Sequence, residues 1–257
     1  MEKDQIMNQL GRVAELWRFP VKSMRGERID SALVGKQGMI GDRAFALLDV
    51  EQNKKVTAKN LRRFPDIFRY KAGFVREPVF GEALPPVRIG MPDGRVIDSD
   101  HEGVDDILSA SLGHAVKLIR VDAADVTAHH DAAPVSVLTN STLARLRQLQ
   151  PKSDFDVRRF RMNIIVETEE SGFAENEWLG RNLLAGAELK LHITVPNARC
   201  VMTTLAQDEL PEDRSVFTAL MQHNRLAGDD GRPAPCAGVY ARALVQGTVS
   251  VGDIISE

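Results

Sequence analysis

The sequence has 257 residues, which is enough for one large domain or two smaller domains with a hydrophobic core. Hydrophobic residues make up 43% and charged residues 27%, and the formal net charge of -3 gives no reason to expect a nucleic-acid or anionic-membrane partner. The apolar runs, such as residues 44–48, are too short to span a bilayer, and the charged start at Met1 to Asp4 lacks the apolar core of a secretory signal. We therefore expect a cytoplasmic protein without a membrane span.

Short strand-like runs separated by turn residues dominate the first half of the chain. Apolar spacing predicts a short helix over residues 103–112. The turn Pro92-Asp93-Gly94 predicts a hairpin between the runs on either side of it. The expected strands cover residues 13–19, 28–34, 43–50, 86–91, 95–98 and 115–121.

The second half begins with a stronger helical pattern, which Thr139 or Asn140 would cap and Pro151 would end. A further helix is predicted over residues 213–226. Strands are expected over residues 161–168, 188–195, 201–205, 239–245 and 248–254. The whole pattern predicts a β-rich α+β protein made of β-barrels, with a boundary near residues 120–130 and two tightly packed halves.

The chain has two cysteines, Cys200 and Cys236, too few for a four-cysteine zinc or iron–sulfur site within the chain. Cysteines in this setting are more often buried small apolar residues than ligands or nucleophiles. Cys200 follows Arg199, and a neighbouring cation favours the thiolate, the form that ligates soft metal centres such as molybdenum or attacks as a nucleophile. Cys236 has no comparable neighbour, so we expect it to be structural.

Three polar clusters are candidates for an anion site. Lys22 and Ser23 follow the first strand, where a charge and a hydroxyl group can hold a phosphate, although an ordinary turn is the commoner explanation. Arg43 starts an apolar strand and can point into a cleft. The basic run over residues 158–163 suits an anionic ligand, although a surface charge run is the commoner explanation. The adjacent pair His129-His130 is expected to be solvated.

Several ordered motifs resemble the MOSC domain family, which is named for the C-terminal part of molybdenum cofactor sulfurase, together with its N-terminal β-barrel domain. The segments that carry the resemblance are residues 16–23 (LWRFPVKS), 41–45 (GDRAF), 56–59 (VTAK), 137–141 (VLTNS), 161–166 (RMNIIV), 199–204 (RCVMTT) and 238–253. The resemblance covers residues 11–256 and is greatest to the amidoxime-reducing group and to bacterial proteins that reduce N-hydroxylated bases. Two departures are Met162, where the family often has Pro, and Ala198, where it often has Ser.

The resemblance implies a MOSC N-terminal β-barrel-like domain over residues 11–122, packed against a β-barrel-type MOSC domain over residues 123–257. It implies that Cys200 is the catalytic residue and the sulfur ligand to the metal of a molybdenum cofactor (molybdopterin). The implied cofactor-binding residues are Lys22, Ser23 and Arg43 at the phosphate, Thr139, Arg161 and Asn163 at the pterin, and Arg199 beside the cysteine.

The resemblance further implies a molybdenum-dependent oxidoreductase that reduces small N-hydroxylated compounds. Because the chain lacks the cysteines for an iron–sulfur domain, its electrons would come from a separate iron–sulfur or flavin reductase protein. One alternative is a carrier in which Cys200 holds the cofactor or a persulfide sulfur for delivery to another protein. The other is a β-barrel protein that has lost the cofactor and serves in interactions.

Overall fold

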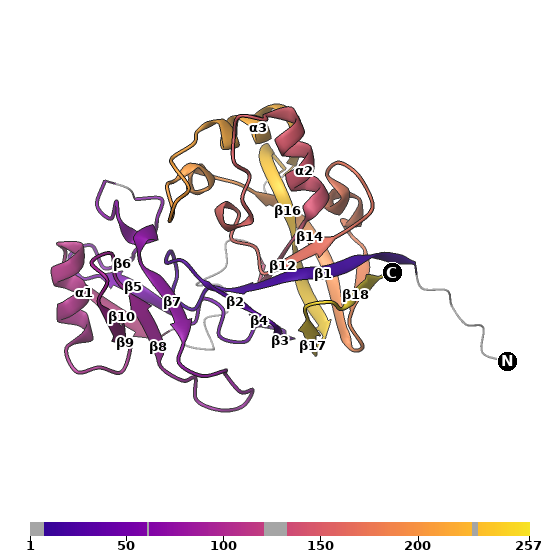
Figure 1. Cartoon of the computed structure of the whole chain (residues 1–257). Coiled ribbons are helices and arrows are strands. Elements are labelled where there is room, and N and C mark those ends of the chain that lie inside the picture. The colour runs from indigo at the N-terminus through magenta and orange to yellow at the C-terminus, as the bar shows by residue number, and fades with distance from the viewer. Residues whose placement is uncertain (1–7, 61, 121–132, 228–230) are drawn as a thin grey trace.

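The structure is a computed structural model that describes residues 8–60, 62–120, 133–227 and 231–257. It divides into a β-barrel and an N-terminal lobe, which we define as residues 20–25 and 42–120 (Figure 1). The predicted domain boundary after residue 122 and the pair His129-His130 lie outside the described residues. Within the described residues, no helix is long and apolar enough to cross a membrane.

Seven strands of the described residues close into a barrel, because the last strand of the series pairs back to the first. All neighbouring pairs are antiparallel except β11 with β12, which is parallel. The strands, in order around the barrel, are β11 (Val135–Thr139), β12 (Ile164–Glu167), β1 (Gln9–Arg18), β18 (Ile254–Ser256), β13 (Asn182–Ala185), β14 (Leu189–Ala198) and β16 (Pro233–Val245). The predicted β-rich α+β class with a barrel is therefore confirmed.

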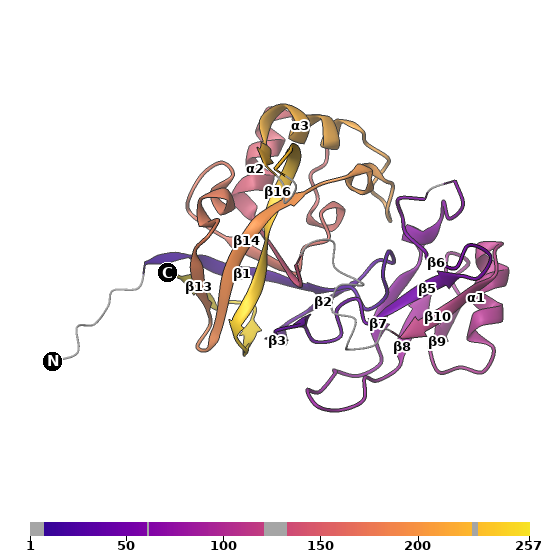
Figure 2. The same cartoon turned by 180° about the vertical axis from the view of Figure 1, so that it is seen from behind.

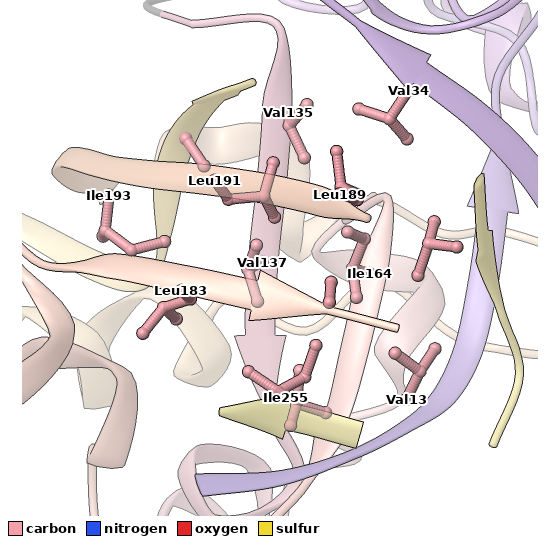
Figure 3. Close-up of a cluster of buried hydrophobic side chains, with 14 of the residues drawn as sticks. Val13, Val34, Val135, Val137, Ile164, Leu183, Leu189, Leu191, Ile193 and Ile255 are labelled. Atoms are coloured by element: carbon pink, nitrogen blue, oxygen red, sulfur yellow. The ribbon is translucent and has the colours of Figure 1, made fainter. Parts of the chain in front are cut away.

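Alternate residues of the barrel strands point inward and fill the interior with branched apolar side chains (Figure 3). Burial of one such side chain contributes about 1.5–3 kcal/mol. Strand β1 supplies Val13 and Leu16, which lie opposite Val166 and Ile164 of β12. The first strand of the chain is therefore part of the barrel that the second half builds.

The N-terminal lobe is built from short sheets around a separate apolar core. Helix α1 (Val104–Leu112) covers the sheet β10-β5-β6, and the predicted hairpin is present as β8 and β9. The strands are β5 (Phe45–Asp49), β6 (Lys54–Lys55), β7 (Lys71–Phe74), β8 (Val87–Gly90), β9 (Val96–Asp98) and β10 (Val116–Arg120). A third small sheet, formed by β3 (Ser31–Gly35), β4 (Gly38–Met39) and β17 (Gly247–Ser250), packs its buried residues into the core of the barrel.

Two helices and their connections cover one end of the barrel (Figure 2). Helix α2 (Asn140–Leu149) begins after Thr139, whose side chain accepts a hydrogen bond from the Thr142 amide, as the predicted cap requires. Helix α3 (Ser215–His223) packs against β16 and the short strand β15 (Arg225–Ala227). Their buried faces share one core with Phe155 and Phe160.

Three predicted strands differ in the structure. Residues 201–205 form the 3-10 helix η4 (Val201–Thr204), because the Thr203 and Thr204 hydroxyl groups donate to the carbonyl oxygens of the preceding turn. Residues 28–34 divide into β2 (Glu27–Ile29) and β3. Residues 248–254 divide into β17 and β18 around Gly252, whose φ of 94° turns the chain.

Candidate functional site

Left-handed backbone conformations are concentrated at predicted site residues. Within the described residues, five non-glycine residues have positive φ: Ser23, Arg43, Asn53, Arg161 and Asp208. A non-glycine residue in such a conformation lowers the stability of the fold by roughly 1–3 kcal/mol, and such residues are concentrated at ligand-binding sites. Three of the five are residues for which the sequence predicts cofactor binding.

Two of these residues meet where the N-terminal lobe contacts the barrel. Arg43 Nη2 donates to the carbonyl oxygen of Arg161 at 3.5 Å, and Arg161 Nη1 donates to the carbonyl oxygen of Met24 at 2.7 Å. Both guanidinium groups lie over the ring of Phe19, at 5.3 Å for Arg43 and 4.3 Å for Arg161. Arg161, from the segment that leads into β12, therefore contacts both the turn after β1 and the segment that carries Arg43.

Lys22 and Ser23 occupy that turn after β1. The Lys22 amide donates to the carbonyl oxygen of Phe45 at 2.8 Å, which holds the turn against β5. Ser23 Oγ accepts a hydrogen bond from the Ala58 amide at 3.1 Å, within the predicted motif at residues 56–59. This contact uses the serine oxygen as an acceptor and leaves its O–H available as a donor.

Cys200 is a half-buried free thiol at the start of η4, and Arg199 separates it from the end of β14. The preceding Arg199 donates from Nη1 to Asn197 Oδ1 at 2.6 Å and from Nη2 to the carbonyl oxygen of Phe160 at 2.8 Å. Its Nε is buried and has no hydrogen-bond partner within the described residues. Since Phe160 precedes Arg161, the cysteine segment is tied directly to the segment that carries the second arginine.

The turn after Cys200 extends this junction into the N-terminal lobe. Leu205 is buried in the core of that lobe together with Phe64 and Phe68, and Met202 packs against the same core. Cys200 therefore lies between Ala198, the last residue of the barrel strand β14, and residues that pack with the N-terminal lobe.

Thr139 and Asn163 form other contacts. The fully buried Thr139 hydroxyl caps α2 and bonds to Glu175. Asn163 Oδ1 accepts from the Ser136 amide and hydroxyl at 3.1 and 2.9 Å, and its Nδ2 donates to the carbonyl oxygen of Trp17 at 3.3 Å. These bonds lie within the barrel wall, so the predicted pterin contacts of both residues stay a prediction.

Glu175 is a buried polar residue that the sequence did not single out. Its carboxylate accepts from the Thr142 hydroxyl at 2.7 and 2.8 Å, from the Gly238 amide at 3.0 Å, and from Thr139. Burial raises the pKa of Glu175, and the donated hydrogen bonds oppose that rise. It lies in a polar run, residues 169–177, that reads as a surface segment, and its partners are remote in sequence.

The residues at the junction suit an anionic cofactor that carries a soft metal. Arginine and lysine side chains and hydroxyl groups are the donors that hold phosphate and pterin oxygens, and a thiolate is a ligand for soft metals. The buried Nε of Arg199 is one N–H group in need of an acceptor. The candidate residues lie in segments that contact one another at this junction: Lys22, Ser23, Arg43, Arg161, Arg199 and Cys200.

Two family models and several known proteins match this chain over most of its length. The MOSC N-terminal beta barrel domain matches residues 10–79, and the MOSC domain matches residues 124–256. Mitochondrial amidoxime reducing component 2 of Bos taurus is 26% identical over 288 residues, covering 96% of this chain and 83% of the relative. Mitochondrial amidoxime-reducing component 1 of Homo sapiens is 24% identical over 288 residues, covering 97% and 83%.

The fold is also found in a solved structure, the YUAD protein from Bacillus subtilis. It superposes with a TM-score of 0.51 at 12% identity and covers 98% of this chain and 97% of its own. The two domain matches together span both halves of the chain in the order that the motifs predicted. The chain therefore belongs to the MOSC domain family.

Proposed function

We propose that the protein is a molybdenum-cofactor-dependent oxidoreductase that reduces small N-hydroxylated compounds. The observation that carries this proposal is the junction itself. There the segment that carries Arg199 and Cys200 bonds to the carbonyl oxygen of Phe160, which precedes Arg161, and Arg161 and Arg43 both lie over the ring of Phe19. The substrate class is supported by the relatives, two of which are named as amidoxime-reducing components.

Each residue at the junction has a separate task in this proposal. The thiolate of Cys200 would bind the metal, and the turn with Lys22 and Ser23, together with Arg43, would bind the terminal phosphate. Arg161, fixed by its hydrogen bond to Met24, would bind the pterin. When bound, the cofactor supplies two-electron transfer coupled to movement of an oxygen atom, while the protein orients it and excludes water.

We further propose that the electrons come from a separate iron–sulfur or flavin protein in the cytoplasm. Cys236 is buried in β16, where its thiol lies 3.2 Å from the carbonyl oxygen of Ala234, and burial raises its thiol pKa. Cys200 and Cys236 are two cysteines, and an iron–sulfur cluster bound by cysteine alone needs four. This supports an electron donor other than these 257 residues.

The test is to purify the protein and measure molybdenum, released pterin and the reduction of an aromatic amidoxime by chemically reduced viologen. We expect metal and pterin in equal amounts and formation of the amidine. Protein without metal, or metal-loaded protein that leaves the amidoxime unchanged, would contradict the proposal. Cyanide-labile sulfur on Cys200 with little metal would identify a sulfur carrier instead.

A further inference from the structure

A buried arginine holds the base of the loop that follows η4, which we call the 205–211 loop. The Arg159 side chain is inaccessible to solvent. Its Nη1 donates to the carbonyl oxygen of Leu205 at 3.2 Å, and its Nη2 donates to the carbonyl oxygen of Pro211 at 2.8 Å. Both ends of the loop are therefore fixed by one side chain of the segment that leads into β12.

The tip of the 205–211 loop reaches the N-terminal lobe through Asp208. Its backbone is left-handed, with φ of 49°, and its carboxylate forms an ion pair with Arg25 Nη1. On the barrel side, Arg158 Nη1 lies 3.7 Å from the same carboxylate. Arg25 also donates from Nη2 to the carbonyl oxygen of Arg69 at 3.0 Å, which anchors it to its own lobe.

The two ends of this ion pair lie close in sequence to the two ends of the candidate site. Arg25 comes shortly after Ser23, and Asp208 belongs to the loop that follows Cys200. The side chains of Arg25 and Asp208 are 20% and 37% exposed, so solvent screens the pair less than a fully exposed one. A change in this contact would therefore shift the serine turn relative to the cysteine.

We propose that the Arg25–Asp208 ion pair is a positioning contact that sets the separation of the turn carrying Ser23 and the segment carrying Cys200. The inference rests on the proposed function, because a single cofactor must reach both segments at once. Misplacement of either segment weakens the hold on such a ligand even when every contacting side chain is present.

The test compares variants that remove or keep the charge. Asp208→Asn keeps the size of the side chain and a residue type that tolerates positive φ, but it removes the carboxylate. Arg25→Gln removes the cation, and Arg25→Lys is the conservative variant that keeps it. The matched control is Asp98→Asn, which removes an exposed ion pair of 2.8 Å with Arg88 in the β8–β9 hairpin.

The first measurement uses protein from which the cofactor has been removed, and follows cleavage after the exposed Glu209 by a glutamate-specific protease. We expect Asp208→Asn and Arg25→Gln to speed cleavage about two- to fivefold, and Arg25→Lys and Asp98→Asn to leave it close to that of the unmodified protein. Equal cleavage rates in all variants would overturn the claim that the ion pair holds the loop.

The second measurement follows loss of pterin from the loaded protein during dialysis. Asp208→Asn and Arg25→Gln are expected to lose pterin faster by a similar factor, with partial recovery in Arg25→Lys, and salt should bring the unmodified protein toward the same rate. Unchanged retention in Asp208→Asn, or equal loss in Asp98→Asn, would overturn the inference. Absence of pterin from the unmodified protein would instead contradict the proposed function and remove the basis for positioning, while cleavage would still report on the loop.

Discussion

Arg199 donates a 2.8 Å hydrogen bond to the backbone carbonyl oxygen of Phe160, and this bond joins two of the sequence motifs that carry the candidate site, because Phe160 directly precedes the second of them. One motif contains Cys200 and the other contains Arg161. Because the bond is made to backbone, the identity of the residue at 160 does not alter it. The arrangement fixes the proposed metal ligand relative to an arginine that contacts the N-terminal lobe.

Replacement of Arg161 by glycine should separate ligand binding from stability. Glycine adopts the native φ of 53° without steric cost, which partly offsets the lost hydrogen bond to Met24 and the lost contacts with Phe19 and Phe68. We expect the free energy of unfolding, measured in urea, to change by no more than about 1 kcal/mol. The amount of co-purified pterin should fall by about tenfold or more.

The matched control for Arg161→Gly is Asn53→Gly. Asn53 also has a left-handed backbone, with φ of 49°, but it lies in the turn between β5 and β6. Its replacement should leave the pterin content unchanged. Equal pterin content in Arg161→Gly and the unmodified protein would show that the guanidinium group does not bind the cofactor.

Arg159→Met should destabilise the protein strongly. The substitution leaves three carbonyl oxygens without their donor, since Arg159 Nε also bonds to the carbonyl oxygen of Asp154 at 2.9 Å. We expect a loss of about 2–4 kcal/mol in the free energy of unfolding, measured by urea denaturation. Arg214→Met, at a side chain that is 88% exposed, should change it by less than about 0.5 kcal/mol. Similar values for the two variants would contradict the assigned role.

Glu175→Gln should alter the pH dependence of stability. Burial raises the pKa of Glu175 above its ordinary value of 4.5, so the folded protein holds this proton more tightly than the unfolded chain. The resulting stabilisation is fully present below pH 4.5 and is lost as the pH rises through the folded pKa. Glutamine does not titrate, so the Glu175→Gln variant does not lose this stabilisation as the pH rises.

The free energy of unfolding of Glu175→Gln minus that of the unmodified protein should therefore increase as the pH rises above 4.5. The increase has an upper limit of about 1.4 kcal/mol per pH unit and stops above the folded pKa. Urea denaturation between about pH 4 and about pH 8 measures it. A difference that stays constant over this range would show that Glu175 titrates equally in both states.

The elements that could be predicted from sequence are those with local signals. Helix α2 has a threonine cap and leucines at helical spacing, and the structure begins it directly after Thr139. The hairpin of β8 and β9 has its turn at Pro92-Asp93-Gly94. The strand predicted over residues 201–205 was wrong, because the pattern of apolar residues does not report the hydrogen bonds from the Thr203 and Thr204 hydroxyl groups to the backbone.

The candidate site residues could be named from the order of the sequence motifs, but the backbone geometry of these residues could not be predicted. Nothing in the sequence indicates that Ser23, Arg43 and Arg161 adopt left-handed backbone conformations. Glycine and asparagine are the residues that usually adopt such conformations, and neither stands at these positions. The burial of Glu175 depends on donors from α2 and β16 that meet only in the folded barrel. The partners of Asp208 are likewise set by tertiary packing.

The most direct test of the account is the metal content of Cys200→Ser beside Cys236→Ser. A hydroxyl group is a poor ligand for a soft metal, so Cys200→Ser should lose tightly bound molybdenum. Its far-ultraviolet circular dichroism spectrum and its midpoint of thermal unfolding should stay close to those of the unmodified protein. Cys236→Ser, at the buried cysteine of β16, should keep its metal. Full molybdenum content in Cys200→Ser, or equal loss in both folded variants, would contradict the assignment of Cys200 as the metal ligand.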